Sequence, residues 1–519
     1  MNNLFFRGPM LDSIKNSYPL VYKYFCSLEG GEEHLRQIQE LDRYWENIRE
    51  RSCPTVVLDG GELPSGVAIS GDYDLLYVGG TLGILHAAVM AEKYGWKVLL
   101  LDKHVAGKST RDWNISREEL HVLYEIGLFS EEEIEECIAC RYKTGWAEFF
   151  VENGNQKRLY LDNVLDCAVN ADQLLGKARK KILFNSANRV FDRTLFRKIY
   201  RFPDYVVVEA EDQNQDLFYY KARAFVDVMG IMSPVAMQLN DGCPQTHVCP
   251  TVGTIATGLE NVDQEVGEIL VSTEPADLSS GSGRQLIWEG FPAGGEKYIT
   301  YLFFYDSVDS DNDKTLLGLF ETYFRKLPDY KKPGPEFSIE RPVFGIIPAY
   351  FHDGFTRTRV IADDHILMLG DAATLGSPLT FCGFGSLVRN LSRLTGNLHE
   401  LLKVNSLDRV SLEAISAYEP NVATMANLMK YMCFNGKTDK PNFVNELMNE
   451  VMLVLDGLPV RYRKAMFRDS MQLGELLTVG IHVALKYPEV LMATPAKLGL
   501  NGSLGMIKNM VGWALSPTE

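Results

Sequence analysis

The pattern of hydrophobic and polar positions changes its period several times along the chain. In the first 70 residues, apolar side chains recur at spacings of three and four between charged neighbours, which predicts an amphipathic helix. The apolar positions are Leu35, Ile38, Leu41, Trp45 and Ile48. A loop rich in Pro and Gly, residues 53–71, ends this helical segment.

Two short apolar runs, residues 75–78 and 98–101, flank a stretch of helical character from Ile84 to Tyr94. Glycines separate the first run from the helix, and Gly95 ends it. A strand, a helix and a second strand within about 30 residues are typical of a β-α-β unit. We therefore expect two parallel strands joined by a helix in this region.

The remaining pattern divides the chain further. Residues 200–345 are mostly strand-like, a buried strand at 366–369 runs into Gly370-Asp371, and the chain beyond about residue 400 has only helical periodicity. The predicted organisation is an N-terminal helical segment (1–70), a discontinuous first domain (71–232 and 341–400), a β-rich second domain (233–340) and a C-terminal helical region (401–519).

The turn between the first strand and the helix is rich in glycine. A dinucleotide fold needs glycine there, because the backbone must approach a pyrophosphate at the helix N-terminus. The turn consists of Gly79, Gly80, Thr81, Leu82 and Gly83, and it does not match G-x-G-x-x-G in either register. Asp102 ends the second strand, where an acid binds a ribose hydroxyl. A turn kept only for helix–strand packing stays open as the alternative.

A second segment has the character of a flavin site. The strand that ends in Gly370-Asp371 precedes Pro378 and a helix opened by Gly383, Phe384 and Gly385. A carboxylate at a strand end accepts hydrogen bonds from a polyol, and the free N–H groups of a helix N-terminus stabilise the negative charge of a reduced flavin. Two separated glycine segments together predict FAD binding. A third strand end, Asp227 to Gly230, is of the D-x-x-G type and resembles the strand end that lies near the FAD in related flavoproteins.

Charge and composition limit the possible partners. The chain has 52 Lys and Arg against 68 Asp and Glu, a net charge of −16, so we expect no nucleic-acid partner. Nine scattered Cys indicate a reducing compartment rather than a disulfide framework. The N-terminus has no signal-peptide pattern, and the longest apolar run, residues 476–485, is about half of a membrane span. We expect a cytoplasmic location without a transmembrane helix.

Three blocks of the sequence resemble the CruA/CruP-type lycopene cyclases, whose fold is related to geranylgeranyl reductases and FAD-dependent aromatic hydroxylases. The blocks are Gly79–Ile84, Trp113–Arg117 and Ser377–Leu391. The resemblance implies an α/β fold: a Rossmann-type FAD-binding domain of the p-hydroxybenzoate hydroxylase kind, an inserted and mainly antiparallel β-sheet substrate domain, and helical ends. It also implies that Lys103 and Arg117 lie among the cofactor contacts.

By the same resemblance, the expected activity is a cyclisation without net redox change. Reduced FAD, with NAD(P)H as reductant, sits beside an acid that protonates lycopene. The carbocation closes to a ring, and loss of a proton gives γ- or β-carotene. Glu289 is the candidate acid, because it follows an apolar strand among aromatic residues, a setting that raises a carboxyl pKa. Glu268, Asp306 and Asp371 are alternatives, and a solvated Glu289 also stays open.

Two other functions remain possible. A prenyl or carotenoid reductase or hydroxylase of the same architecture would consume its reductant with product, and a non-catalytic carotenoid-binding paralogue would not depend on Glu289. A hydrocarbon substrate also suggests peripheral contact with a membrane through C-terminal apolar side chains such as Ile507 and Val511.

Several motifs favour simpler interpretations. Asn114 starts a sequon but lies at the entry to a helix capped by Ser116, and the resemblance implies a flavin or substrate contact there. The pair Cys137 and Cys140, and the loop with Cys243, His247 and Cys249, lack the spacing of a complete ligand set. We therefore expect no metal site.

Overall fold

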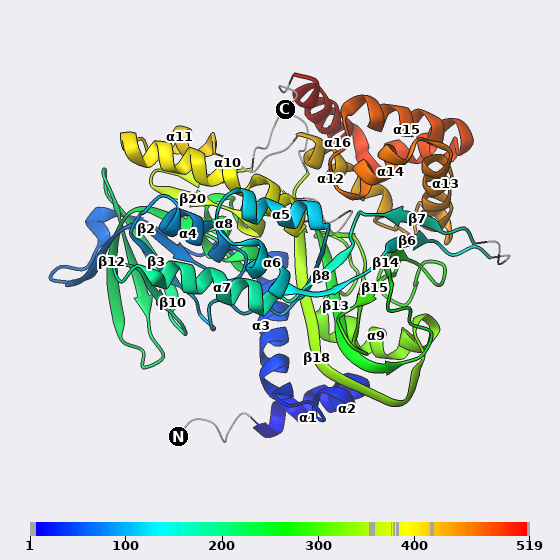
Figure 1. Ribbon diagram of the computed structural model, residues 1–519, viewed down its shortest axis with the longest axis horizontal. Helices are drawn as coiled ribbons and strands as arrows, with labels where there is room; N and C mark the ends of the chain where they lie inside the picture. The colour runs from blue at the N-terminus through cyan, green and yellow to red at the C-terminus, as the bar shows by residue number, and fades with distance from the viewer. Residues whose placement is uncertain are drawn as a thin grey trace.

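The computed structural model describes residues 7–152, 154, 156–351, 359–374, 376, 379, 383–415 and 420–515. These residues form three sheets, with helices at both ends of the chain (Figure 1). The predicted β-α-β unit is confirmed as β2 (Ile69–Val78), α4 (Gly83–Glu92) and β3 (Val98–Leu101), with β2 and β3 parallel.

Nine strands of the described chain form the first sheet, in the order β1-β10-β11-β12-β2-β3-β9, with β20 beside β12 and β19 beside β20. Its other strands are β1 (Val57–Asp59), β9 (Arg189–Phe191), β10 (Leu195–Arg201), β11 (Val206–Glu211), β12 (Leu217–Asp227), β19 (Ala362–Asp363) and β20 (Ile366–Met368). Strands β2, β3, β9, β12 and β20 are mutually parallel, so their carboxyl ends meet at one edge.

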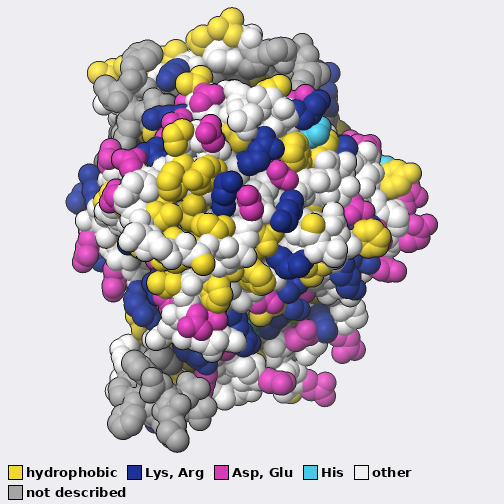
Figure 2. Space-filling view, turned by 90° about the vertical axis from the view of Figure 1, so that its left-hand side faces the viewer, with side chains coloured by type: hydrophobic (Ala, Val, Ile, Leu, Met, Phe, Trp, Pro, Cys, Tyr) yellow, Lys and Arg dark blue, Asp and Glu magenta, His cyan; other side chains and the backbone are white. Residues whose placement is uncertain are grey.

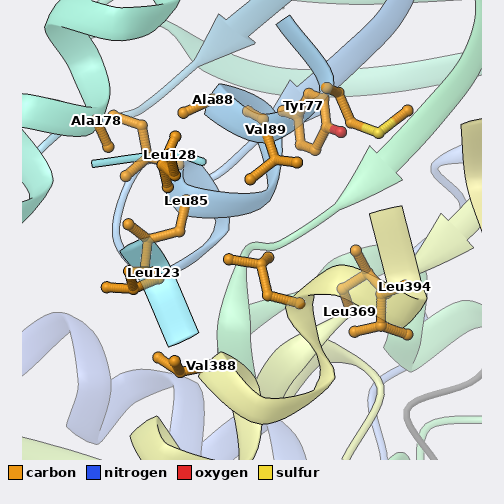
Figure 3. Packing of buried hydrophobic residues seen from close by; sticks show 14 of the residues in the cluster. Tyr77, Leu85, Ala88, Val89, Leu123, Leu128, Ala178, Leu369, Val388 and Leu394 are labelled. Atoms are coloured by element: carbon orange, nitrogen blue, oxygen red, sulfur yellow. The ribbon is translucent and has the colours of Figure 1, made fainter. Parts of the chain in front are cut away.

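Helices cover one face of this parallel region, because the strands and helices bury continuous apolar runs against each other. They are α4, α5 (Arg117–Glu125), α6 (Glu131–Cys137), α7 (Ala171–Phe184) and α10 (Gly383–Val404). Figure 3 shows Tyr77 of β2 beside Val89 of α4, with Leu123, Ala178 and Leu394 brought in by other helices. The predicted cap of α5 is present, since the Ser116 hydroxyl accepts a hydrogen bond from the Glu119 N–H, and Ser130 caps α6 in the same way by accepting from the Glu133 N–H.

The second sheet contains eight of the described strands and is largely antiparallel, with only β6 and β14 paired in parallel. Its strands are β6 (Thr144–Glu148), β7 (Leu159–Asp162), β13 (His247–Leu259), β14 (Val266–Val271), β15 (Ile287–Pro292), β16 (Tyr298–Phe303), β17 (Asp306–Ser307) and β18 (Pro333–Ala349). Strands β6 and β7 lie within the sequence range assigned to the first domain, yet they extend this second sheet.

Each face of the second sheet packs on a different group of helices. One face contacts the N-terminal helices and α9, and the other faces the C-terminal helices. The first group is α1 (Arg7–Ser17), α2 (Pro19–Phe25), α3 (Gly31–Arg49) and α9 (Leu316–Tyr330), with the short α8 (Pro234–Leu239) nearby. The predicted amphipathic helix is confirmed as α3, whose apolar positions pack towards β18 and α9.

A small sheet of β4 (Trp113–Ile115), β5 (Ile138–Arg141) and β8 (Cys167–Val169) lies between the two large sheets. Beyond residue 404 the described chain is helical, as predicted. These helices are α11 (Arg409–Glu413), α12 (Pro420–Met432), α13 (Phe443–Gly457), α14 (Val460–Phe467), α15 (Leu473–Lys486) and α16 (Glu489–Leu515).

Figure 2 shows the side on which the outer strands of the first sheet lie, where hydrophobic side chains are interspersed with Lys, Arg, Asp and Glu. Among the described helices, none by itself is long and apolar enough to cross a membrane. Helices α15 and α16 pass that test only as a pair, which is bent by 119°.

Candidate functional site

The predicted cofactor residues gather at the carboxyl edge of the first sheet. Gly79 follows β2, Asp102 follows β3, Asp227 ends β12 and Gly370 follows β20. Strands β2, β12 and β20 are adjacent and parallel, so these positions share one crevice. A crevice at the carboxyl ends of parallel strands is where open α/β sheets bind their ligands.

Three glycines of the turn are required by close packing within the protein. Gly79 has φ of 110°, and a Cβ atom there would lie 2.2 Å from the Val228 carbonyl oxygen. A Cβ on Gly80 would lie 2.5 Å from that of Ala106, and one on Gly83 would meet the Val228 side chain at 2.4 Å. The packing explanation therefore accounts for these glycines whether or not a cofactor binds. Thr81 and Leu82 lie between Gly80 and Gly83 and connect the turn to α4.

Asp102 is held by the turn itself. Its Oδ2 accepts a hydrogen bond from the Gly80 N–H at 2.5 Å, and its Oδ1 accepts one from the His104 N–H at 2.6 Å. The neighbouring Lys103 lies at the surface, where its Nζ is 3.0 Å from Glu40 of α3. Asp102 thus fixes the glycine turn, and a ribose would have to use its remaining lone pairs.

Two other glycines at this edge face open space. Gly230 and Gly370 both have left-handed backbone, with φ of 69° and 60°, and a Cβ on either would meet none of the described atoms within 4 Å. Asp227 shapes the first of these turns, since its buried carboxylate accepts hydrogen bonds from the Met229 N–H and the Ser233 hydroxyl. Burial raises the pKa of Asp227 to about 6. This open backbone cradle is suited to a phosphate or polyol group.

Asp371 faces a basic partner across the crevice. Its carboxylate lies 3.9 Å from Nη2 of Arg111, and desolvation raises its pKa although the side chain is 41% exposed. Arg111 was not predicted from the sequence, and it adds a cation to the same crevice.

The N-terminus of α10 lies beside α5 and β4. Phe384 stacks on Trp113 with ring centroids 4.7 Å apart. A Cβ on Gly385 would lie 2.8 Å from Oε1 of Glu119, so this glycine admits the Glu119 carboxylate, which pairs with Arg389. Gly383 begins the helix, and Pro378 lies outside the described residues.

Arg117 points elsewhere. Its side chain is mostly exposed and pairs with Glu135 of α6 at 3.4 Å. Its role in cofactor binding stays a prediction.

A single segment, residues 110–114, connects this crevice with the second sheet. Thr110 exchanges backbone and side-chain hydrogen bonds with Phe344 of β18. Arg111 faces Asp371, and Asp112 pairs with Arg341 of β18 at 2.7 Å. Trp113 turns back to α10, and the next residue, Asn114, lies at Glu289.

Glu289 is buried on β15 in an apolar and aromatic environment. Its sequence neighbours Trp288 and Gly290 face Tyr330 of α9, so the Glu289 side chain points to the opposite side, together with Ile287 and Phe291. Burial raises the pKa of Glu289 to about 8, and the nearby Asn114 amide partly opposes this effect. No Lys, Arg or His of the described chain forms an ion pair with it. Glu289 is therefore protonated at neutral pH.

Asn114 is oriented by its own partner. The Tyr142 hydroxyl donates a hydrogen bond to Asn114 Oδ1, which turns the amide nitrogen away from Tyr142. That Nδ2 atom is buried and makes no aligned hydrogen bond with any described residue. The structure thus brings together two residues, Asn114 and Glu289, that the sequence suggested separately.

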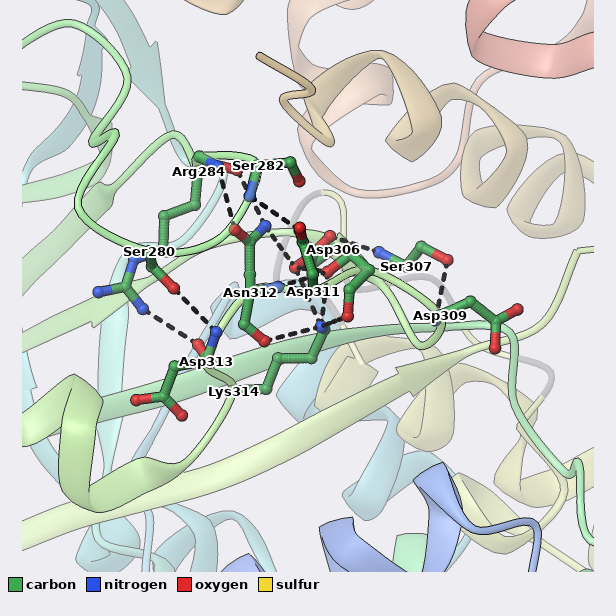
Figure 4. A network of polar contacts seen from close by, with 12 residues as sticks. Ser280, Ser282, Arg284, Asp306, Ser307, Asp309, Asp311, Asn312, Asp313 and Lys314 are labelled. Carbon is green, nitrogen blue, oxygen red and sulfur yellow. Dashed lines mark hydrogen bonds and ion pairs between the residues drawn. The ribbon is translucent and has the colours of Figure 1, made fainter. Parts of the chain in front are cut away.

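The alternative acid Asp306 is held in a network of its own (Figure 4). Its carboxylate accepts hydrogen bonds from Ser310 at 2.6 Å and Asn312 at 2.9 Å, and it lies 3.3 Å from the buried Lys314 ammonium. These contacts occupy the Asp306 carboxylate within its own loop. Asp306 therefore fixes its loop, and nothing in its contacts directs it towards a substrate.

Glu268, the other alternative on this sheet, is also paired. It forms a buried ion pair with Lys331 and faces the α9 side of the sheet, opposite to Glu289. Among the four candidate acids, Glu289 alone is both buried and without a charged partner in the described chain.

An apolar cavity of about 410 Å³ lies among the C-terminal helices. Its lining includes Leu270, Leu379, Met425, Met452, Val479 and Met510. Leu270 of β14 lies on the same side of the sheet as Glu289, and the Tyr305 hydroxyl, at the end of β16, donates to the Leu379 carbonyl at 2.8 Å. The hydroxyls of Tyr431 and Thr494 in the lining pair with each other at 2.8 Å. This cavity suits a hydrocarbon ligand.

The cysteines do not form a metal site in the described part of the chain. No group of three or more His, Cys, Asp or Glu residues there could hold a metal ion. Cys137 of α6 and Cys249 of β13 are both buried. Burial raises the pKa of each thiol.

No protein-family model matches this chain, and no curated protein matches it in sequence. Solved structures do match. A geranylgeranyl bacteriochlorophyll reductase-like protein from Thermoplasma acidophilum has a TM-score of 0.58 at 14% identity, over 82% of this chain and 99% of that one. A flavoprotein/dehydrogenase from Cytophaga hutchinsonii has a TM-score of 0.56 at 12% identity, over 82% and 100%. The halogenase PltM, in complex with phloroglucinol and FAD, has a TM-score of 0.54 at 12% identity, over 85% and 96%.

The predicted fold class is therefore confirmed. The chain has the fold of FAD-binding reductases and hydroxylases, with helical ends added to it. At these identities the comparison establishes the fold alone.

Proposed function

We propose that this chain binds FAD at the carboxyl edge of the first sheet and acts as a lycopene cyclase. The observation that carries the proposal is the neutral, buried carboxyl of Glu289, placed on the same side of the second sheet as an apolar cavity. Cyclisation of an acyclic polyene needs a proton donor in a dry site and no polar recognition. The three sequence blocks described above point to the same family.

The residues that would hold FAD are those of the crevice. The turn from Gly79 to Gly83 and the N-terminus of α4 suit the pyrophosphate, and Asp102 suits the adenosine ribose. Asp371, with Arg111 opposite, suits the ribityl chain and the approach to the ring. When bound in reduced form, FAD supplies negative charge next to the cationic centre that cyclisation creates.

The chain's own residues account for the acid step. Glu289 holds a proton at neutral pH because its anion would be desolvated, so a proton is available beside an apolar acceptor. Asn114, held by Tyr142, is placed to stabilise the carboxylate that remains after the proton leaves. The packed aromatic surroundings, including Tyr301 across the strand pair, exclude water from the cation.

A redox function of the same architecture is the second candidate. It is favoured by the structural neighbours, which are described as a reductase-like protein, a dehydrogenase, a halogenase and a monooxygenase. In a prenyl or carotenoid reductase or hydroxylase, NAD(P)H would be consumed in proportion to product. In the cyclase, reductant is needed only to prime the cofactor.

The decisive experiment is anaerobic incubation of the purified protein with lycopene, FAD and an excess of reductant, followed by pigment analysis and measurement of reductant consumed. Ring formation at unchanged oxidation level supports the cyclase, and product matched by reductant supports the reductase. Glu289→Gln should abolish ring formation while FAD content is kept. Glu260→Gln, at an exposed surface pair with Lys332, is the matched control and should keep full activity. Unaltered lycopene with FAD bound would refute the cyclase.

A further inference from the structure

Helices α15 and α16 carry several exposed apolar side chains. On α15, Leu477, Ile481 and Leu485 lie four residues apart on one exposed stripe. On the last part of α16, beyond a kink at Gly499, Ile507, Val511 and Leu515 repeat the same spacing and are also exposed. Exposed apolar side chains that gather in this way mark a site of interaction.

The junction between the two helices extends this surface. Lys486 ends α15 and Glu489 begins α16, with a sharp bend of 119° between the helices. Leu485 and Met492, on either side of the bend, are 78% and 80% exposed. The pair together has the length and the low charge of a membrane segment, and its bend fits a re-entrant segment as well as a broken span.

Helices α15 and α16 carry cations beside their exposed apolar side chains. Of the seven Lys and Arg in residues 460–515, four form ion pairs, three of them with carboxylates outside this range. Lys486 and Lys508 are exposed beside the apolar stripes, and neither has a carboxylate partner in the described chain. Long cationic side chains at the border of an apolar face can reach lipid phosphates while their stems remain in contact with apolar groups.

The same helices line the apolar cavity. Leu477 and Ile481 of α15 and Leu491 of α16 are exposed, and each also lines the cavity. The surface and the cavity are therefore continuous, and a hydrocarbon could pass between them without crossing water.

We infer that α15 and α16 form a monotopic docking surface that lies in one leaflet of an anionic lipid bilayer, with the mouth of the apolar cavity opening into the acyl region. The apolar stripes enter the leaflet, and Lys486 and Lys508 lie at the phosphates. The inference depends on the helices and their charge, and only the direction of substrate entry rests on the proposed function.

The test is flotation of the full-length protein with vesicles, in the absence of flavin and carotenoid. The protein should float with vesicles of phosphatidylcholine and phosphatidylglycerol, and less with phosphatidylcholine alone. The double variant Leu485→Asp, Met492→Asp should lower vesicle binding about tenfold or more, because it puts two charges on the inserted face. Neither residue lines the cavity.

A matched control variant carries the same substitutions elsewhere. Val404→Asp with Val410→Asp changes two side chains that are 70% and 76% exposed on α10 and α11, and it should bind vesicles like the unaltered protein. Lys486→Glu with Lys508→Glu should remove the preference for anionic lipid.

Three results would overturn the inference: no flotation of the unaltered protein, equal loss in the Val404 and Val410 control, or self-association that the Leu485 and Met492 variant abolishes without vesicles. The last would assign the surface to a second copy of the chain. Since vesicle binding needs no turnover, failure of cyclase activity with flotation intact would refute only the proposed function.

Discussion

Replacement of Glu289 by Gln should make the stability of the protein less sensitive to pH. In the unfolded chain Glu289 ionises near its ordinary pKa of 4.5, and in the folded protein burial raises this pKa to about 8. Between these values the folded state holds one proton more than the unfolded state. The free energy of unfolding therefore falls with rising pH, by about 1.4 kcal/mol per pH unit from this group alone.

The difference between the two proteins isolates this effect. A glutamine side chain cannot ionise, so the stability of the Glu289→Gln variant relative to the unaltered protein should rise through the window from 4.5 to about 8. Integrated over that window, the change is roughly 5 kcal/mol, and it should level off above pH 8. Glu260→Gln, at an exposed pair, should leave the pH dependence unchanged.

Urea unfolding at pH 5, 6, 7, 8 and 9, followed by tryptophan fluorescence, measures this difference, because Trp288 adjoins the site. Infrared spectroscopy at pH 7 provides an independent check: a protonated carboxyl band should be present and should be absent in the variant. Parallel stability curves for the two proteins between pH 5 and 8 would refute the assignment of Glu289 as a neutral buried acid.

Other predictions follow from the same structure. Ring formation should decline as pH rises through about 8, because Glu289 then loses the proton that it donates, and a rate measured across pH 6 to 9 tests this. Gly79→Ala should lower the free energy of unfolding by at least about 2 kcal/mol and lower the FAD content, since the new Cβ meets a carbonyl oxygen. Gly95→Ala is the control, because Gly95 has positive φ but open space around it. It should lower the free energy of unfolding by roughly 1 kcal/mol, measured by thermal unfolding, and keep FAD. Asp306→Asn leaves a buried lysine without its counter-charge and should cost about 3–5 kcal/mol, against less than about 1 kcal/mol for Glu260→Gln. Equal urea midpoints for these last two variants would contradict the buried-pair reasoning.

Local patterns in the sequence were enough to predict the parts of the fold that depend on local physics. The β-α-β unit around Gly79 and the helix that contains Leu35 and Trp45 follow from short-range periodicity, and both are present. The burial of Glu289 followed from its apolar and aromatic neighbours on one strand. Such features need no knowledge of distant segments.

Other features depend on contacts between distant segments. Strand β6 pairs with β14 more than 100 residues later, so sequence order alone could not place it in the second sheet. Arg111 reaches Asp371, and Glu119 occupies the space that Gly385 leaves, only because the first domain is built from two separated pieces. Arg111 lies in sequence between two blocks predicted to contact the cofactor. This position of a basic residue was the only local signal that could have suggested it.

The cavity among the C-terminal helices has a wall that can change shape. Seven of the 17 methionines in the chain line it, among them Met425, Met452 and Met510. Unbranched thioether side chains rotate easily and are polarisable, so the cavity can adapt to apolar ligands of different shapes. The same chemistry makes it vulnerable: oxidation of these residues to sulfoxides would place polar groups along the apolar lining before the fold itself is lost.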